Sequence, residues 1–157
     1  GVSVGEADFV KVLLNKLGEV VFWKIAMKPG RPLAYGKIGN AHFFGLPGNP
    51  VAVMVTFYQF VREALLVLMG RTSIDPIPTL KVLCTSPIKK VPGRTEFQRG
   101  ILSQDANGVW IVKVTGDQGS GILKSMSDAN CFIVLQQAQG NIEAGAMVDV
   151  QLFEGVT

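Results

Sequence analysis

The side chains best suited to bind an anion lie around Lys24 and Lys28, which are followed directly by Pro-Gly-Arg-Pro at 29–32. Two ammonium groups and a guanidinium in so short a span suit a small anionic ligand. The apolar run 19–27 predicts a strand, and residues four apart share one face of a strand. We therefore expect Lys24 and Lys28 to act together, the alternative being a solvated, charged sheet edge.

The second segment is Gly-Leu-Pro-Gly-Asn-Pro at 45–50, directly before a long apolar stretch. Pro47 fixes its own φ, and Gly48 is expected to take a left-handed backbone step. Asn49 is a good N-cap, and Pro50 suits the first position of a helix. The turn predicts a helix N-terminus whose N–H groups and dipole favour an anion such as phosphate, although a stiff connection without a ligand fits the turn alone equally well.

A third segment, Gly-Val-Ser-Val-Gly-Glu-Ala-Asp at 1–8, combines a glycine-bearing turn with carboxylates at the start of a helix. Ser3 and Gly5 are small enough to bring the backbone close to a ligand, and Asp8 could bind a metal ion or a polar ring edge. The alternative is that Glu6 and Asp8 only complement the helix dipole.

Composition excludes several classes of function. The chain has 157 residues, is 48% hydrophobic and 17% charged, and carries a formal net charge of +3. The whole excess lies before residue 70, which is too little for a nucleic-acid footprint. Cys84 and Cys131 have no metal-type spacing and are expected to be reduced core residues of an intracellular protein. Because His42 is the only histidine, a His-rich metal site is not expected.

The secondary-structure elements that must position these residues fall into two parts of the chain with different predicted structure. Residues 1–70 predict an α/β unit with a first helix from Glu6, a tight hairpin at Gly39-Asn40 and a helix over 50–69; its strands are expected at 19–27, 33–38 and 41–46. The helix is interrupted by charged residues and is expected to be buried on most sides of a soluble fold rather than to span a membrane. Residues 71–78 carry two prolines and predict a linker.

Residues 79–157 have an all-β texture, with turn signals between short strands. A small closed barrel or sandwich is expected. The predicted strands are 80–85, 95–103, 109–115, 131–135 and 147–153. The chain has no initiator Met or signal peptide at Gly1, and we expect it to be part of something longer.

Taken in order, the three segments and the later Pro-Gly-Arg-Thr-Glu-Phe-Gln-Arg-Gly at 92–100 closely resemble the C-terminal part of MoeA/gephyrin-type molybdopterin molybdotransferases. The resemblance implies the end of a MogA-like α/β molybdopterin-binding domain, truncated so that its parallel strands lack neighbours, and then a C-terminal β-barrel domain. It also implies insertion of molybdenum from molybdate into adenylylated molybdopterin, with release of AMP.

The resemblance also implies roles for single residues. Asp8 matches an active-site acidic residue, which would hold Mg²⁺ or another divalent cation. Lys24 and Lys28 match a basic pair suited to molybdate or phosphate. The matching ligand-binding positions are Pro47, Pro50, Arg99 and Ser120, and the two glycine-bearing turns described above add Ser3, Gly5, Gly48 and Asn49 as ligand-binding candidates. A cytoplasmic homodimer with a small anionic pterin substrate, without nucleic acid or membrane, is expected. The alternatives are a non-catalytic scaffold and a small-anion-binding module.

Overall fold

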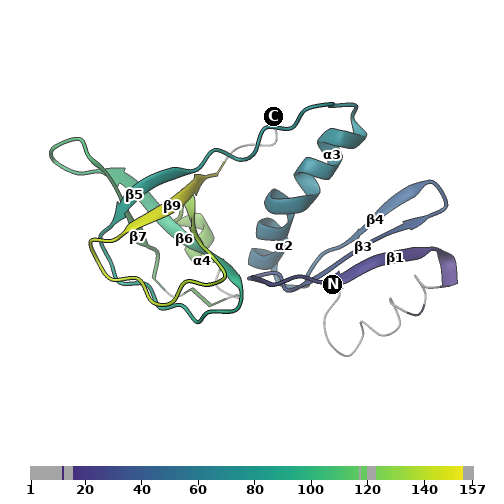
Figure 1. The fold of residues 1–157 in the computed structure, drawn as a ribbon, viewed down its shortest axis with the longest axis horizontal. Coiled ribbons are helices and arrows are strands. Elements are labelled where there is room, and N and C mark those ends of the chain that lie inside the picture. The colour runs from purple at the N-terminus through teal and green to yellow at the C-terminus, as the bar shows by residue number, and fades with distance from the viewer. Residues whose placement is uncertain (1–11, 13–15, 117, 120–122, 154–157) are drawn as a thin grey trace. The chain divides into compact units, whose positions relative to one another are not determined.

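The computed structural model describes residues 12, 16–116, 118–119 and 123–153. The chain divides into two compact units, Gly1–Ile74 and Asp75–Thr157. The division falls inside the segment 71–78, in which Asp75 and Pro76 are exposed and no helix or strand forms. Each unit is described by itself below (Figure 1).

The first unit contains a three-stranded sheet in the order β1-β3-β4, in which β1 is Glu19–Lys24, β3 is Pro32–Ile38 and β4 is Ala41–Gly45. Both pairings are antiparallel, so the expectation of parallel strands is wrong. The reason is that both connections are short, and short connections join antiparallel neighbours. One of them is the predicted turn at Gly39-Asn40, where Gly39 has a φ of +57°.

The predicted strand 19–27 is interrupted in the structure. After β1 the backbone leaves the sheet at Ile25–Ala26, and a separate two-residue strand, β2, follows at Met27–Lys28. The Ile25 N–H donates to the carbonyl oxygen of Arg31 at 3.0 Å. Because this bond closes the loop 25–31 at its base, Lys24 and Lys28 do not share the face of one strand, and that part of the prediction is wrong.

The predicted helix over 50–69 forms as one continuous run from Pro50 to Leu68. It consists of α2 (Pro50–Thr56), the π-helical segment η1 (Phe57–Val61) and α3 (Arg62–Leu68). Asn49 is its N-cap, with the side-chain oxygen accepting from the Ala52 N–H at 3.2 Å, and Pro50 is at the first helical turn. These two predictions are confirmed.

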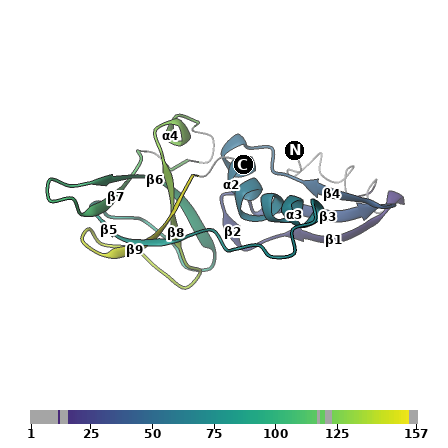
Figure 2. The same ribbon diagram turned by 90° about the horizontal axis from the view of Figure 1, so that it is seen from above.

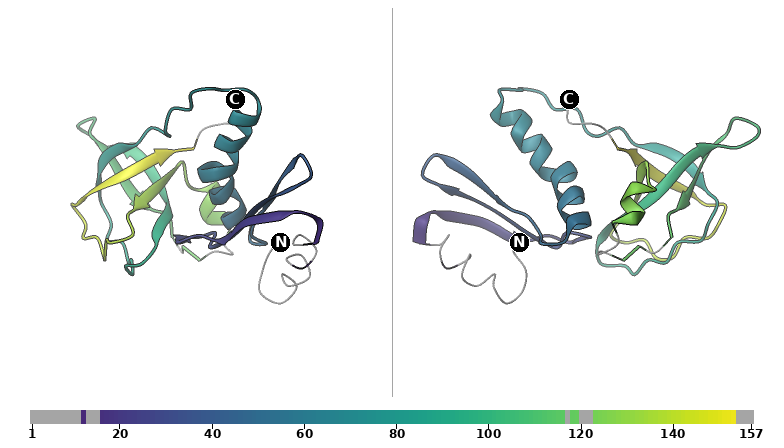
Figure 3. Two further views of the ribbon diagram at one scale, coloured as in Figure 1. Left: turned by 45° about the vertical axis from the view of Figure 1, so that its right-hand side comes forward. Right: turned by 180° about the vertical axis from the view of Figure 1, so that it is seen from behind.

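The helix is less buried than expected. Its length and mean hydropathy of 1.7 would also allow a membrane span, a weak indication for a single helix, and only 28% of the apolar window is buried. Buried residues occur in α2 and at Val61, whereas α3 has none. Figures 1 and 3 show the helix diverging from the β3–β4 hairpin towards α3. The small sheet therefore covers only the first turns, and the prediction of burial on most sides is wrong.

The second unit is a closed barrel of five strands, as the sequence predicts. The strands are β5 (Leu80–Cys84), β6 (Thr95–Gln104), β7 (Trp110–Val114), β8 (Cys131–Leu135) and β9 (Met147–Leu152). They follow one another around the barrel in the order β6-β7-β5-β9-β8, and β8 pairs back onto β6. A short helix, α4 (Lys124–Ser127), lies next to β6 and has no counterpart in the prediction (Figure 2).

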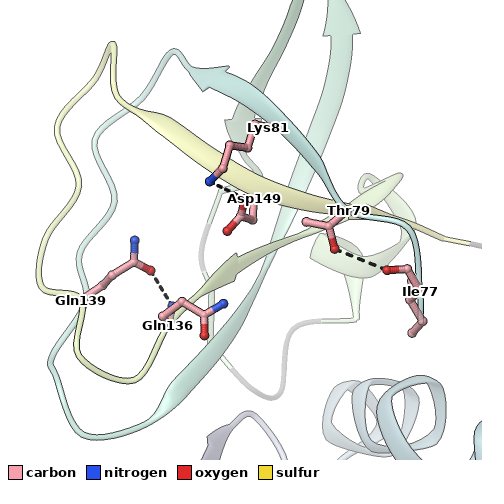
Figure 4. Close-up of polar contacts among 6 residues, drawn as sticks. All are labelled: Ile77, Thr79, Lys81, Gln136, Gln139 and Asp149. Carbon is pink, nitrogen blue, oxygen red and sulfur yellow. Dashed lines mark hydrogen bonds and ion pairs between the residues drawn. The ribbon is translucent and has the colours of Figure 1, made fainter. Parts of the chain in front are cut away.

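Alternate residues of the strands fill the barrel with apolar side chains. Gly100 of β6 makes room for them, because a Cβ there would lie 2.9 Å from Ile133 Cγ1 and 3.0 Å from both Cys131 Sγ and Val112 Cγ2. Cys131 and Cys84 are free, buried thiols, as expected. Outside the barrel, Lys81 of β5 pairs with Asp149 of β9 at 2.9 Å (Figure 4), an exposed ion pair of small energetic value. The core residues are Val82, Cys84, Ile88, Leu102, Val112, Cys131, Ile133, Leu135, Val148 and Val150.

Candidate oxyanion site

Three basic residues of the first unit, Lys24, Lys28 and Arg31, lie at or on the loop that joins β1 to β3. Lys24 ends β1 directly opposite Pro32 at the start of β3, so the intervening residues form a closed loop. Lys24, Lys28 and Arg31 are exposed on this loop, whereas Met27, Pro29 and Gly30 are buried. We call residues 24–31 the basic loop. It therefore carries three exposed cationic side chains within a short closed segment.

The turn 45–50 lies at the same end of the sheet as the basic loop. Ala34, near the start of β3, pairs with Gly45 at the end of β4. The turn begins at Gly45, and the first turns of α2 follow it. A Cβ placed on Gly30 would lie within 2.5 Å of Thr56 Cγ2 and 3.6 Å of the Ala52 carbonyl oxygen, so the basic loop is packed directly against α2. The fold thus brings together the two anion-binding segments predicted in this part of the chain.

The turn itself differs from the prediction in one respect. Gly48 is not among the glycines with positive φ, so the expected left-handed step is absent there, and the left-handed glycine beside the helix is Gly30, with a φ of +102°. The side chain of Asn49 occupies the Ala52 N–H, Pro50 has no N–H, and Val51 is fully buried. The helix end therefore offers fewer amides than expected, and the exposed residues of the turn are Gly48 and Pro50.

The only histidine is remote from this end of the sheet. His42 pairs with Lys37 towards the Gly39-Asn40 turn, and its Nδ1 lies 2.9 Å from Tyr35 Oη. Cationic side chains are therefore the prominent chemical groups of the basic loop. Such groups can hold and orient an oxyanion and neutralise charge that develops on it.

Arg99, the predicted ligand residue of the barrel, is 1% exposed. Its Nε donates to Ser125 Oγ and its Nη2 to the Gly119 carbonyl oxygen, both at 3.0 Å. Its backbone N–H and carbonyl are bonded to the side chain of Gln118 at 2.8 and 3.1 Å. The guanidinium thus organises the segment around α4 in the second unit. A direct contact with a ligand stays a prediction.

A second cation of the barrel, Lys90, is also buried, at 4% exposure. Its Nζ donates to the carbonyl oxygens of Arg94 and Gln139 at 3.0 Å and of Val91 at 3.3 Å. The ammonium group therefore joins two loops of the barrel, and its hydrogen-bonding capacity of three is met by backbone. This lysine is structural.

Two family models match the chain. One, described as a probable molybdopterin binding domain, matches residues 1–67. The other, described as the MoeA C-terminal region (domain IV), matches residues 81–153. The chain belongs to the MoeA family.

Relatives in this family are longer than the chain. The molybdopterin molybdenumtransferase of Haemophilus influenzae is 48% identical over 98% of this chain and 38% of its own length. Gephyrin of Dictyostelium discoideum is 36% identical over 94% of this chain and 24% of its own length. Each match thus includes less than half of the relative.

Solved structures agree with the fold. A molybdopterin biosynthesis MoeA protein from Pyrococcus horikoshii OT3 matches with a TM-score of 0.71 and 28% identity, covering 89% of this chain and 34% of that one. A molybdenum cofactor biosynthesis protein from Pyrococcus furiosus matches with a TM-score of 0.72 and 28% identity, over 93% and 54% of the two chains. These likenesses support the α/β unit followed by a barrel.

Four predicted site residues of this MoeA-family chain lie outside the described residues, namely Ser3, Gly5, Asp8 and Ser120. In the part of the chain that the structure describes, no three His, Cys, Asp or Glu side chains gather into a metal site. Binding of Mg²⁺ or another divalent cation by Asp8 therefore stays a prediction. The predicted homodimer likewise stays a prediction.

Sequence reasoning passed over two members of the site end of the sheet. Arg31 lies within Pro-Gly-Arg-Pro, and nothing in the sequence distinguishes it there from a residue of a solvated sheet edge. Gly30 was not singled out at all. The signal that could have identified Gly30 is its place between Pro29 and Pro32 in a loop with apolar residues on one side.

Proposed function

We propose that this MoeA-family chain takes part in molybdenum cofactor biosynthesis by holding oxyanions of the substrates on its basic loop. The reaction is the transfer of molybdenum from molybdate to adenylylated molybdopterin, with release of AMP. The observation that carries the proposal is that Lys24, Lys28 and Arg31 are all exposed on one closed loop, at the end of the sheet where the turn 45–50 lies.

The chemistry assigned to these residues is positioning and charge stabilisation. Lys24 and Lys28 are compact point charges suited to molybdate, while the planar fork of Arg31 suits two oxygens of a phosphate. Binding a doubly charged oxyanion beside these cations lowers its effective charge and holds it against the pterin substrate. Pro47 and Pro50 stiffen the adjoining turn, so that the exposed Gly48 presents the backbone at a fixed place.

The test compares two lysines of the same sheet. Lys28→Ala should weaken molybdate binding by about 1–3 kcal/mol, as expected for a lost charge-assisted hydrogen bond. Lys37→Ala is the matched control, because Lys37 is an equally exposed lysine on β3 towards the opposite end. Calorimetric titration with molybdate, and the molybdenum insertion rate with adenylylated molybdopterin, give the comparison. Equal affinities and rates for the two variants would remove Lys28 from the site.

A non-catalytic scaffold is the second class of function. The observation that favours an interaction surface is the apolar α3, which has no buried residue. Loss of molybdate binding without loss of partner binding would separate the two functions. The basic loop supports the oxyanion role more directly, because its residue types match the substrate.

A further inference from the structure

The basic loop contacts α2 at Gly30. A Cβ at this position would lie 2.5 Å from Thr56 Cγ2, closer than a real side-chain carbon tolerates, and 3.5 Å from Met27 Cε. The φ of +102° at Gly30 is a second and independent restriction, because L side chains rarely adopt it. The backbone of the loop therefore lies directly on the methyl group of Thr56.

The methyl group is itself held in place. Thr56 is fully buried, and its Oγ1 donates to the carbonyl oxygens of Ala52 at 2.8 Å and Val53 at 3.0 Å. Because both heavy atoms on Cβ rotate together, fixing the hydroxyl towards the preceding turn also fixes the methyl towards Gly30. The Thr56 methyl group therefore has a fixed position against the loop.

The positions of Lys28 and Arg31 depend on the contact between Gly30 and Thr56. Arg31 is bonded covalently to Gly30, and Lys28 is two residues away. The other end of the loop cannot open freely to absorb a displacement, because the Ile25 N–H is bonded to the Arg31 carbonyl at 3.0 Å. A shift of Gly30 away from the helix therefore also moves Lys28 and Arg31, which lie on either side of it in the sequence. A shift of roughly 1 Å in a positioning element can cost on the order of a hundredfold in rate.

We infer that Gly30 and Thr56 are positioning residues, which set where the basic loop holds its oxyanion. The inference rests on the proposed function of the loop. Neither residue offers the ligand a charged group, and both act through Lys28 and Arg31. A purely structural contact would instead change ligand affinity only in step with the stability of the unit.

The test is a rescue experiment on the whole chain with molybdate as the probe. Gly30→Ala should weaken molybdate binding about tenfold or more, because the new Cβ pushes the loop off the Thr56 methyl. Adding Thr56→Ser removes that methyl but keeps the hydroxyl. The double variant should recover about threefold or more of the lost affinity, more than the change in its melting temperature accounts for. Affinity that changes only in proportion to the melting temperature overturns the inference.

A second variant keeps the inference testable where Gly30→Ala does not fold. Thr56→Ala removes the methyl group that supports Gly30. Amide hydrogen exchange at Ile25 should then accelerate about tenfold, while exchange in β6 is unchanged. Molybdate binding should weaken. Unchanged exchange at Ile25 and unchanged affinity overturn the inference. Lys28→Ala separates the two claims. If it weakens binding and the Gly30 and Thr56 variants do not, only the positioning claim fails; if Lys28→Ala has no effect, the proposed function fails as well.

Discussion

Replacing Arg99 with methionine should destabilise the barrel by about 2–4 kcal/mol. The change keeps an unbranched apolar stem and removes the hydrogen bonds from a charged donor to Ser125 Oγ and the Gly119 carbonyl. Each such bond contributes about 1.5–3 kcal/mol. Relief of the cost of burying a guanidinium, of several kcal/mol, offsets part of that sum, whereas the acceptors left behind lose their donor.

Arg94→Met is the matched control, because Arg94 is an exposed arginine of the same unit and should change the free energy of unfolding by less than about 0.5 kcal/mol. Urea unfolding followed by circular dichroism gives the stability, and hydrogen exchange of β6 amides assigns the loss to the barrel. Equal stability of the Arg99 and Arg94 variants would refute the reasoning. Loss of ligand affinity at unchanged stability would instead make Arg99 a ligand residue.

Three further predictions concern the two units. Burial raises the pKa of the Cys131 thiol from 9.0 to about 11. The stability that the neutral thiol contributes is therefore complete below pH 9 and is lost as the pH rises towards 11, by up to about 3 kcal/mol. Urea unfolding between pH 9 and pH 11 should show a smaller loss of stability for Cys131→Ala than for the unchanged chain, and equal losses would contradict this prediction. Gly100→Ala should cost about 1–3 kcal/mol of barrel stability by overpacking, measured by thermal melting, and a neutral change would mean that the core yields. Limited proteolysis should cut within 71–78 and leave a resistant barrel, and a resistant core spanning both units with no barrel-only product would count against this.

Local signals predicted most of the fold. The five barrel strands were placed within one or two residues, because turns such as Pro92-Gly93 and Asn107-Gly108 mark their ends, and Asn49 and Pro50 fixed the start of the helix. The short α4 was not predicted, because four residues show no helical period. Turn and cap residues can be recognised within a few positions of the sequence, whereas a four-residue helix is too short to show a periodic pattern.

The errors at the site come from tertiary contacts. Lys24 and Lys28 looked like neighbours on one strand, but a bond from Ile25 to Arg31 closes a loop between them. The left-handed glycine is Gly30 rather than Gly48, and Gly30 also lies where a Cβ would meet the Thr56 methyl. The burial of Arg99 depends on Ser125, which lies 26 residues away along the chain. Contacts of this kind cannot be predicted from the spacing of residues in the sequence.

The most direct test of the central claim is to locate molybdate on the chain. Crystals soaked with molybdate, with diffraction recorded at the molybdenum absorption edge, give the metal position from its anomalous signal. We expect a peak over the basic loop, with an oxygen about 2.7–3 Å from Nζ of Lys24 or Lys28, and its loss in Lys28→Ala but not in Lys37→Ala. A peak elsewhere on the chain, or an unchanged peak in Lys28→Ala, would contradict the account.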